Sequence, residues 1–98
     1  GVLNRRSILQ QLQARLEQPG KPLCMVMADI DFFKQVNDRH GHASGDRVLI
    51  GFAHALGSEL RKDDLLGRVG GEEFLLILDN ATLTEAQAVV ERMRQQPQ

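Results

Sequence analysis

The chain has few of the residues that anchor a large or crosslinked fold. It contains no Trp and no Tyr, and only four Phe, three Pro and one Cys in 98 residues. An apolar share of 42% is enough for one modest core, built mainly from Leu, Val, Ile and Ala in a single domain. Cys24 has no second cysteine to pair with. We interpret it as a small core residue in a reducing compartment.

Long apolar runs and a charge excess are also absent. No stretch approaches the ~18 apolar residues of a membrane-spanning helix, and no secretory signal is evident. Twelve basic and 13 acidic residues give a net charge of −1. That balance gives no general reason to expect nucleic-acid or membrane binding. The chain also lacks the glycine-rich P-loop motif, so any binding of a nucleoside triphosphate must use another kind of site.

The spacing of apolar residues predicts the order helix, strand, helix, helix, strand, strand, helix. Six consecutive apolar residues at 23–28 suit a strand that is buried on both faces. Pro19-Gly20 ends the first helix, Ser44 is a plausible cap of the long third one, and Thr82 or Thr84 caps the last. The other expected elements are a helix at 8–16, a short helix at 32–38, a loop at 40–45, a helix at 49–60, strands at 65–69 and 74–78, and a helix to Met93.

This order is an α+β pattern of the ferredoxin-like kind, with a central antiparallel sheet packed with helices. Such a pattern normally closes with a fourth strand, and none follows before Gln98. We therefore expect residues 1–98 to hold only the first part of a domain, with an unpaired edge along 23–28.

The most informative feature is the run Gly70-Gly71-Glu72-Glu73 between two apolar stretches. Paired glycines predict a hairpin turn, because glycine reaches positive φ without steric cost. Adjacent carboxylates on a tight turn suggest that a cation is held there. If the hairpin packs beside the first strand, its turn comes close to Asp29. Two carboxylates that close repel by roughly 4 kcal/mol at an effective dielectric of about 20, and Mg²⁺ with phosphate oxygens would remove that cost.

The local sequence around the first strand has a simpler interpretation. Asp31 could cap a helix that begins at Phe32, while Asp29 is hydrogen-bonded at the end of the strand. Taken alone, the local sequence favours that interpretation over a metal site. The turn carboxylates are what make the metal site the sharper hypothesis.

Six stretches of the chain carry a family resemblance: Leu3-Asn4-Arg5-Arg6, Asp29-Ile30-Asp31-Phe32-Phe33-Lys34, Asn37-Asp38, His40-Gly41-His42, Gly45-Asp46 and Arg68-Val69-Gly70-Gly71-Glu72-Glu73-Phe74. Together they resemble the GGDEF domain of diguanylate cyclases, in its GGEEF form. The similarity runs over nearly all of the chain, in the family's order and spacing, and implies the nucleotidyl-cyclase palm fold. The chain covers roughly the first two thirds of the family's domain. A later strand and a C-terminal helix, whose Lys and Arg reach the phosphates, are missing.

The resemblance implies a role for each matched residue. Asp29, the Ile30 carbonyl and Glu72 would hold Mg²⁺, with Mn²⁺ as an alternative, and Lys34 would meet charge on the triphosphate. Asp29, Lys34 and Glu72 would be the catalytic set. Glu73 would position the turn or a neighbouring subunit. The substrate contacts implied by the family are Phe32, Phe33, Asn37, His42 and Asp46.

A second constellation, Arg61-Lys62-Asp63-Asp64, resembles the family's RxxD inhibitory product site. Arg61 and Asp64 would bind cyclic dimeric GMP, with Arg92 of the last helix as an additional arginine. We expect these three residues to share one exposed patch. In isolation, a charge run of this kind is more often a solvated helix end.

The resemblance implies a bacterial diguanylate cyclase that condenses two GTP into cyclic dimeric GMP and pyrophosphate. Catalysis would need a homodimer, and a sensor domain would precede Gly1. The segment would be cytoplasmic, even in a membrane-anchored protein, and residues 1–98 alone would be inactive. The alternative is a non-catalytic GGDEF-derived module that binds GTP or cyclic dimeric GMP for regulation.

Overall fold

The computed structural model describes residues 2–18, 20–29 and 45–94, and gives the backbone alone for residues 45–50, 52 and 94. The predicted short helix at 32–38 and the Ser44 cap lie outside this part of the chain. No helix in the described ranges is long and apolar enough to cross a membrane. The elements in chain order are α1 (Arg5–Leu16), β1 (Leu23–Asp29), α3 (Gly45–Ser58), β2 (Leu65–Arg68), β3 (Glu73–Asp79) and α4 (Leu83–Arg94).

The three described strands form one antiparallel sheet in the order β1-β3-β2. β3 is the central strand, and it pairs with β1 from Leu23 opposite Asp79 to Asp29 opposite Glu73. On its other side, β3 pairs with β2. The α+β architecture with a central antiparallel sheet is therefore confirmed.

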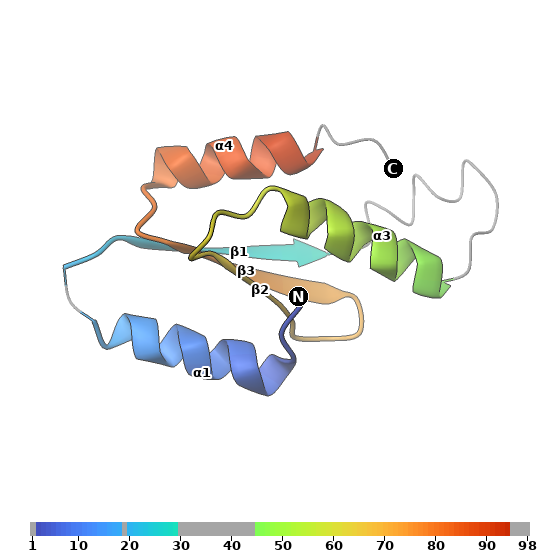
Figure 1. Ribbon diagram of the computed structural model, residues 1–98, viewed down its shortest axis with the longest axis horizontal. Coiled ribbons are helices and arrows are strands. Elements are labelled where there is room, and N and C mark those ends of the chain that lie inside the picture. The colour runs from blue at the N-terminus through green and yellow to red at the C-terminus, as the bar shows by residue number, and fades with distance from the viewer. Residues whose placement is uncertain (1, 19, 30–44, 95–98) are drawn as a thin grey trace.

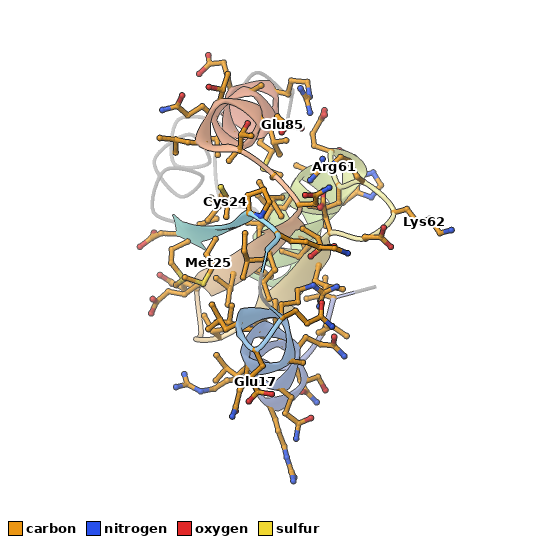
Figure 2. The ribbon with its side chains drawn as sticks, turned by 90° about the vertical axis from the view of Figure 1, so that its left-hand side faces the viewer. Glu17, Cys24, Met25, Arg61, Lys62 and Glu85 are labelled. Atoms are coloured by element: carbon orange, nitrogen blue, oxygen red, sulfur yellow. The ribbon has the colours of Figure 1, made fainter. Side chains whose placement is uncertain are left out.

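The prediction that residues 23–28 form a strand buried on both faces is wrong. β1 lies at the edge of the described sheet, and its side chains alternate between half-buried and exposed. Met25 and Met27 are 54% and 58% exposed, and Figure 2 shows Met25 at the outer edge of the sheet. The same residues would be buried on both faces only in a strand with helices packed over each side.

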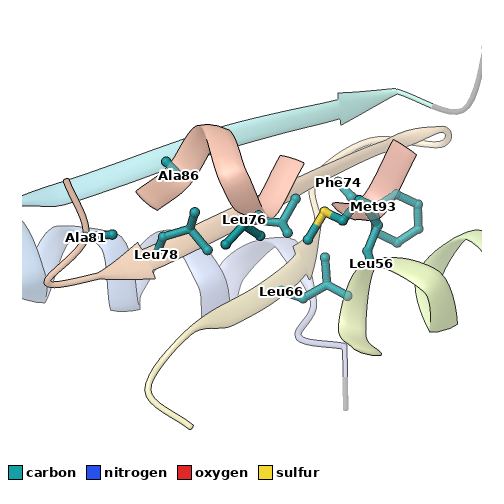
Figure 3. Close-up of a cluster of buried hydrophobic side chains, with 9 residues drawn as sticks. Leu56, Leu66, Phe74, Leu76, Leu78, Ala81, Ala86 and Met93 are labelled. Atoms are coloured by element: carbon teal, nitrogen blue, oxygen red, sulfur yellow. The ribbon is translucent and has the colours of Figure 1, made fainter. Parts of the chain in front are cut away.

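Helices cover both faces of the sheet, with α3 and α4 on one face and α1 on the other (Figure 1). The alternation of β3 divides the apolar residues between these faces. One cluster, on the α3/α4 face, is shown in Figure 3 and consists of Leu56, Leu66, Phe74, Leu76, Leu78, Ala81, Ala86, Val89 and Met93. The second, on the α1 face, consists of Ile8, Leu75 and Ile77.

Side-chain caps fix where α1 and α4 begin. The Ser7 N–H donates to Asn4 Oδ1 at 2.8 Å, which makes Asn4 the N-cap of α1. At α4, the Glu85 N–H donates to Thr82 Oγ1 at 3.2 Å, and the Thr82 N–H donates to Glu85 Oε1 at 3.1 Å. This reciprocal pair is a capping box, so Thr82, of the two predicted candidates, is the cap.

Candidate functional site

The predicted metal site lies at one end of the sheet. β1 ends at Asp29, the β2–β3 turn carries the glycines, and α3 begins at Gly45; Figure 1 shows all three at the same end. In the ladder, Asp29 stands directly opposite Glu73. Directly opposed residues of antiparallel strands have Cα atoms about 4.5–5.5 Å apart. The hairpin therefore brings its turn close to Asp29, as the sequence predicted.

The ladder partner of Asp29 is Glu73, whereas the resemblance names Glu72 as a metal ligand. Glu72 precedes β3 within the turn and is half-buried, while Asp29 and Glu73 are exposed. Two carboxylates from adjacent strands form a donor set that suits Mg²⁺, which completes its shell with waters and phosphate oxygens. Within residues 2–18, 20–29 and 45–94, no group of three His, Cys, Asp or Glu side chains could hold a metal ion by itself. Ile30 lies outside those residues.

Backbone hydrogen bonds hold the glycine turn in place. The N–H groups of Val69 and Gly70 both donate to the Glu73 carbonyl, at 2.9 and 3.3 Å. Arg68 donates to the Gly70 carbonyl at 3.2 Å and to the Gly71 carbonyl at 2.6 Å. The carboxylate-bearing residues therefore follow a well-defined turn.

The predicted hairpin exists, but the predicted reason for its glycines is wrong. Neither Gly70 nor Gly71 has a φ in the left-handed region. A Cβ at Gly70 would lie 3.0 Å from Glu73 Oε1, which is tighter than an ordinary contact, and a Cβ at Gly71 would meet nothing. The atom closest to that Cβ is the end of the exposed Glu73 side chain, so neither a positive φ nor a fixed obstacle requires glycine at position 70.

Most of the predicted substrate contacts lie outside the described residues, namely Phe32, Phe33, Asn37 and His42, and so does the predicted catalytic residue Lys34. Asp46 lies in the first turn of α3, whose start is at the same end of the sheet as Asp29 and the turn. Asp29, the turn glutamates and the helical turn that contains Asp46 thus lie at one end of the sheet.

Sequence reasoning gave no role to Arg5, although its guanidinium reaches the turn. Arg5 Nη1 donates to the Val69 carbonyl at 2.6 Å, across 64 positions of sequence. A local signal was present, because Arg5 and Arg6 occupy the first turn of α1, which contains no acidic residue. The positive end of the helix dipole disfavours cations there, so such arginines need another partner.

The second constellation centres on a buried ion pair. Arg61 Nε donates to Asp64 Oδ2 at 3.0 Å, and Arg61 Nη2 donates to Asp64 Oδ1 at 3.2 Å. The Asp64 side chain is 1% exposed, and the Arg61 side chain is 44% exposed. The expectation that the three product-site residues share one exposed patch is therefore wrong for Asp64. Asp64 instead lies beneath Arg61 and accepts hydrogen bonds from its guanidinium.

Hydrogen bonds set the charge state of this pair. Burial alone would raise the pKa of Asp64, but hydrogen bonds from the Arg61 side chain and from the Arg61 and Asp79 N–H groups lower it overall. The Asp64 hydrogen bond and nearby carboxylates likewise raise the pKa of Arg61. Both groups are therefore ionised at neutral pH.

Both predicted product-site arginines have acidic neighbours on another element. Arg61 Nη1 lies 3.6 Å from Glu85 Oε2 at the start of α4, and Figure 2 labels both side chains. Arg92 Nε, further along α4, donates to Glu59 Oε2 at 2.9 Å, and its side chain is 51% exposed. The two arginines thus lie along the junction of α4 with the segment that follows α3.

The sequence matches one family model along its whole length. The model is the diguanylate cyclase GGDEF domain, and the match covers residues 1–98. A probable diguanylate cyclase of Escherichia coli, DgcT, is 40% identical over 95 residues, which are 96% of this chain and 21% of that protein. The response regulator PleD of Caulobacter vibrioides is 42% identical over 97 residues, with the same shares. The chain thus spans about a fifth of the length of these relatives.

Solved structures that resemble this chain include diguanylate cyclases as well. The diguanylate cyclase SiaD of Pseudomonas aeruginosa, solved with its activator SiaC, is 51% identical with a TM-score of 0.77, over 93% of this chain and 36% of that one. The active GGEEF domain of a Vibrio cholerae diguanylate cyclase is 37% identical with a TM-score of 0.78, over 97% of this chain and 63% of that one.

Proposed function

This chain belongs to the GGDEF family of diguanylate cyclase domains, and we propose that the protein containing it joins two GTP molecules into cyclic dimeric GMP. The observation that carries the proposal is the pairing of Asp29 with Glu73, which brings the GGEEF turn to the end of β1. That is where the family's metal and triphosphate would lie. The proposed substrate, GTP, is found in the cytoplasm, so we infer that the reaction takes place there.

The proposed reaction is two phosphoryl transfers between facing subunits. Each 3′-hydroxyl oxygen forms a bond to the α-phosphorus of the partner's GTP, the bond to the β-phosphate oxygen breaks, and pyrophosphate leaves. The hydroxyl proton passes to solvent. Such a reaction needs positioning and charge stabilisation more than a covalent intermediate. A homodimer is therefore required, and a preceding sensor domain would control how its subunits meet.

Asp29, Glu72 and the Ile30 carbonyl would hold Mg²⁺. The metal supplies positive charge that neutralises the triphosphate. In this chain, the β1–β3 ladder keeps Asp29 beside the GGEEF turn, and the backbone hydrogen bonds of the turn restrict its movement. Lys34 would add a point charge beside the phosphates.

Asn37 and Asp46 would select guanine, and Phe32, Phe33 and His42 would complete the nucleotide contacts. A carboxylate accepts hydrogen bonds from the N1 and N2 donors of guanine, a pattern that adenine does not offer. The start of α3 places Asp46 at the same end of the sheet as the turn, which supports this assignment.

Arg61 and Arg92 would bind the product at a separate inhibitory site. Arg61 Nη1 is the guanidinium nitrogen that neither Asp64 nor Asp79 engages, so phosphate or guanine would bind there in place of Glu85, which now lies 3.6 Å away. Asp64 is buried and bound to Arg61, so we assign it the task of orienting Arg61.

The alternative is a GGDEF-derived module that binds GTP or cyclic dimeric GMP without turnover. The deciding experiment incubates the complete parent protein with GTP and Mg²⁺ and separates the products by chromatography. We expect cyclic dimeric GMP and pyrophosphate, and expect neither from a Glu72→Gln variant. Tight nucleotide binding by the wild-type protein, with no cyclic product, would establish the alternative instead.

A further inference from the structure

The segment that enters the domain is joined to the central hairpin before α1 begins. Leu3 forms an isolated parallel bridge with Gly67 of β2. The Leu3 N–H donates to the Leu66 carbonyl at 2.8 Å, and the Arg68 N–H donates to the Leu3 carbonyl at 2.9 Å. Leu3 therefore fixes the start of the chain to the strand that leads into the GGEEF turn.

The packing of α1 against β2 fixes the same part of the chain in place. Ile8 is fully buried, and a Cβ added at Gly67 would lie only 2.6 Å from Ile8 atoms. α1 therefore lies directly against β2 at this point, where only a glycine leaves room for the Ile8 side chain. Asn4 caps the helix between these two contacts, so the residues from Leu3 to Ile8 dock on β2 as one unit.

Arg5 extends this docking from β2 to the turn. It stands at the first position of α1, where the helix dipole disfavours a cation. Its bond to the Val69 carbonyl, the 2.6 Å contact described above, gives that charge a partner. Arg6, next to it in the same helical turn, is exposed and has no such bond to the turn.

We propose that Arg5 is a positioning residue that fixes the GGEEF turn, and with it the turn carboxylates, relative to the segment that enters the domain. Only the catalytic consequence of this role rests on the proposed cyclase function. Arg68 also binds turn carbonyls, but it belongs to the hairpin and moves with it. Arg5 belongs to α1, so it ties the turn to a second element. A displacement of α1 relative to β2 would then change the positions of Glu72 and Glu73.

The test compares Arg5→Gln, Arg5→Lys and Arg6→Gln in the complete parent protein. Both glutamine variants remove one positive charge from the same helical turn, and only Arg5→Gln removes the bond to Val69. We expect Arg5→Gln to lower kcat about tenfold with a nearly unchanged KM for GTP, as loss of one charge-assisted hydrogen bond predicts. Arg6→Gln should match wild type, and Arg5→Lys should recover part of the rate with its single donor.

Hydrogen exchange followed by mass spectrometry gives a readout that does not need activity. In Arg5→Gln, the peptide spanning residues 66–74 should exchange about tenfold faster at its turn amides, while residues 75–79 of β3 stay protected. A uniform increase across β3, or equal behaviour of Arg5→Gln and Arg6→Gln, would overturn the proposal and leave a general stabilising role. If the wild-type protein makes no cyclic product, the function fails, and the exchange data alone still decide the role of Arg5.

Discussion

Asp64 lies buried beneath Arg61, and the two side chains share paired hydrogen bonds through both carboxylate oxygens of Asp64. Arg61 Nη2 also donates to the Asp79 carbonyl at 2.7 Å, and the Asp79 N–H donates back to Asp64 Oδ1 at 3.0 Å. The RxxD segment is thus anchored to the end of β3. This arrangement makes the pair part of the fold and leaves Arg61 Nη1, which lies 3.6 Å from Glu85 Oε2, as the nitrogen that a ligand could bind.

Arg61→Ala should weaken product inhibition about tenfold without lowering the initial rate, because the proposed product site is separate from Asp29 and Glu72. Inhibition constants for cyclic dimeric GMP measure the effect in the parent protein. Lys62→Ala is the matched control, since Lys62 is the exposed neighbour. Loss of catalysis together with inhibition, in a variant that still folds, would mean that the two sites are not distinct.

Asp64→Asn should lower the free energy of unfolding by about 1–3 kcal/mol, because an amide cannot accept at both positions that Arg61 and the Asp79 N–H now fill. Urea unfolding of this variant and of Asp63→Asn, whose side chain is exposed, measures the difference. Equal stability of the two variants would show that the buried pair contributes little.

The same variant should remove a pH dependence. The folded state lowers the pKa of Asp64, so its contribution is fully present above the ordinary aspartate pKa of about 3.9 and is lost as the pH falls through the folded value. The free energy of unfolding of wild type should therefore fall more than that of Asp64→Asn between pH 7 and pH 3. Parallel losses in the two proteins would assign the acid sensitivity to other carboxylates.

Glu72→Gln should reduce cyclic dimeric GMP synthesis by about a hundredfold or more, while the melting temperature stays near that of wild type. Glu73→Gln is the informative comparison, because Glu73 is the ladder partner of Asp29. We expect Glu73→Gln to keep a measurable rate. The reverse result, with Glu73→Gln inactive and Glu72→Gln active, would transfer the metal-binding role to Glu73.

Asp46→Asn should lower GTP affinity about tenfold, since an amide donor would face the donors of guanine at a cost of ~1–3 kcal/mol. Calorimetric titration with a non-hydrolysable GTP analogue measures this. ATP-analogue binding should change little. Unchanged affinity for the GTP analogue would return Asp46 to the ordinary role of an acidic residue in the first turn of a helix.

The purified 98-residue chain alone should not cyclise GTP. By the resemblance, the Lys and Arg that reach the phosphates come from a later part of the domain, and the exposed Met25 and Met27 leave one face of the edge strand β1 uncovered. Product analysis at high protein concentration tests this. Robust synthesis by this chain would show that residues 1–98 hold the whole catalytic unit.

Local patterns in the sequence determined the elements and the kind of site. Apolar periodicity identified α1 and α4, and Thr82 identified the start of α4, because caps and helix faces depend on residues three or four positions apart. Continuous apolar runs on both sides of Gly70-Gly71 identified the hairpin, because its two strands and its turn are also adjacent in the sequence. The whole set of motifs, from Leu3-Asn4-Arg5-Arg6 to the GGEEF turn, carried the resemblance to the family, whereas any one of them would have been weak.

Only the tertiary structure decided how these pieces meet. Six apolar residues read the same in a central strand as in an edge strand, and pairing with β3 is what placed Met25 and Met27 at the edge. Which glutamate stands opposite Asp29 depends on ladder register, since a shift of one residue exchanges the faces. The hydrogen bond from the Asp79 N–H to the buried Asp64 and the hydrogen bond from Arg5 to Val69 join residues that are far apart in sequence. Such contacts are set by packing, and local propensity does not encode them.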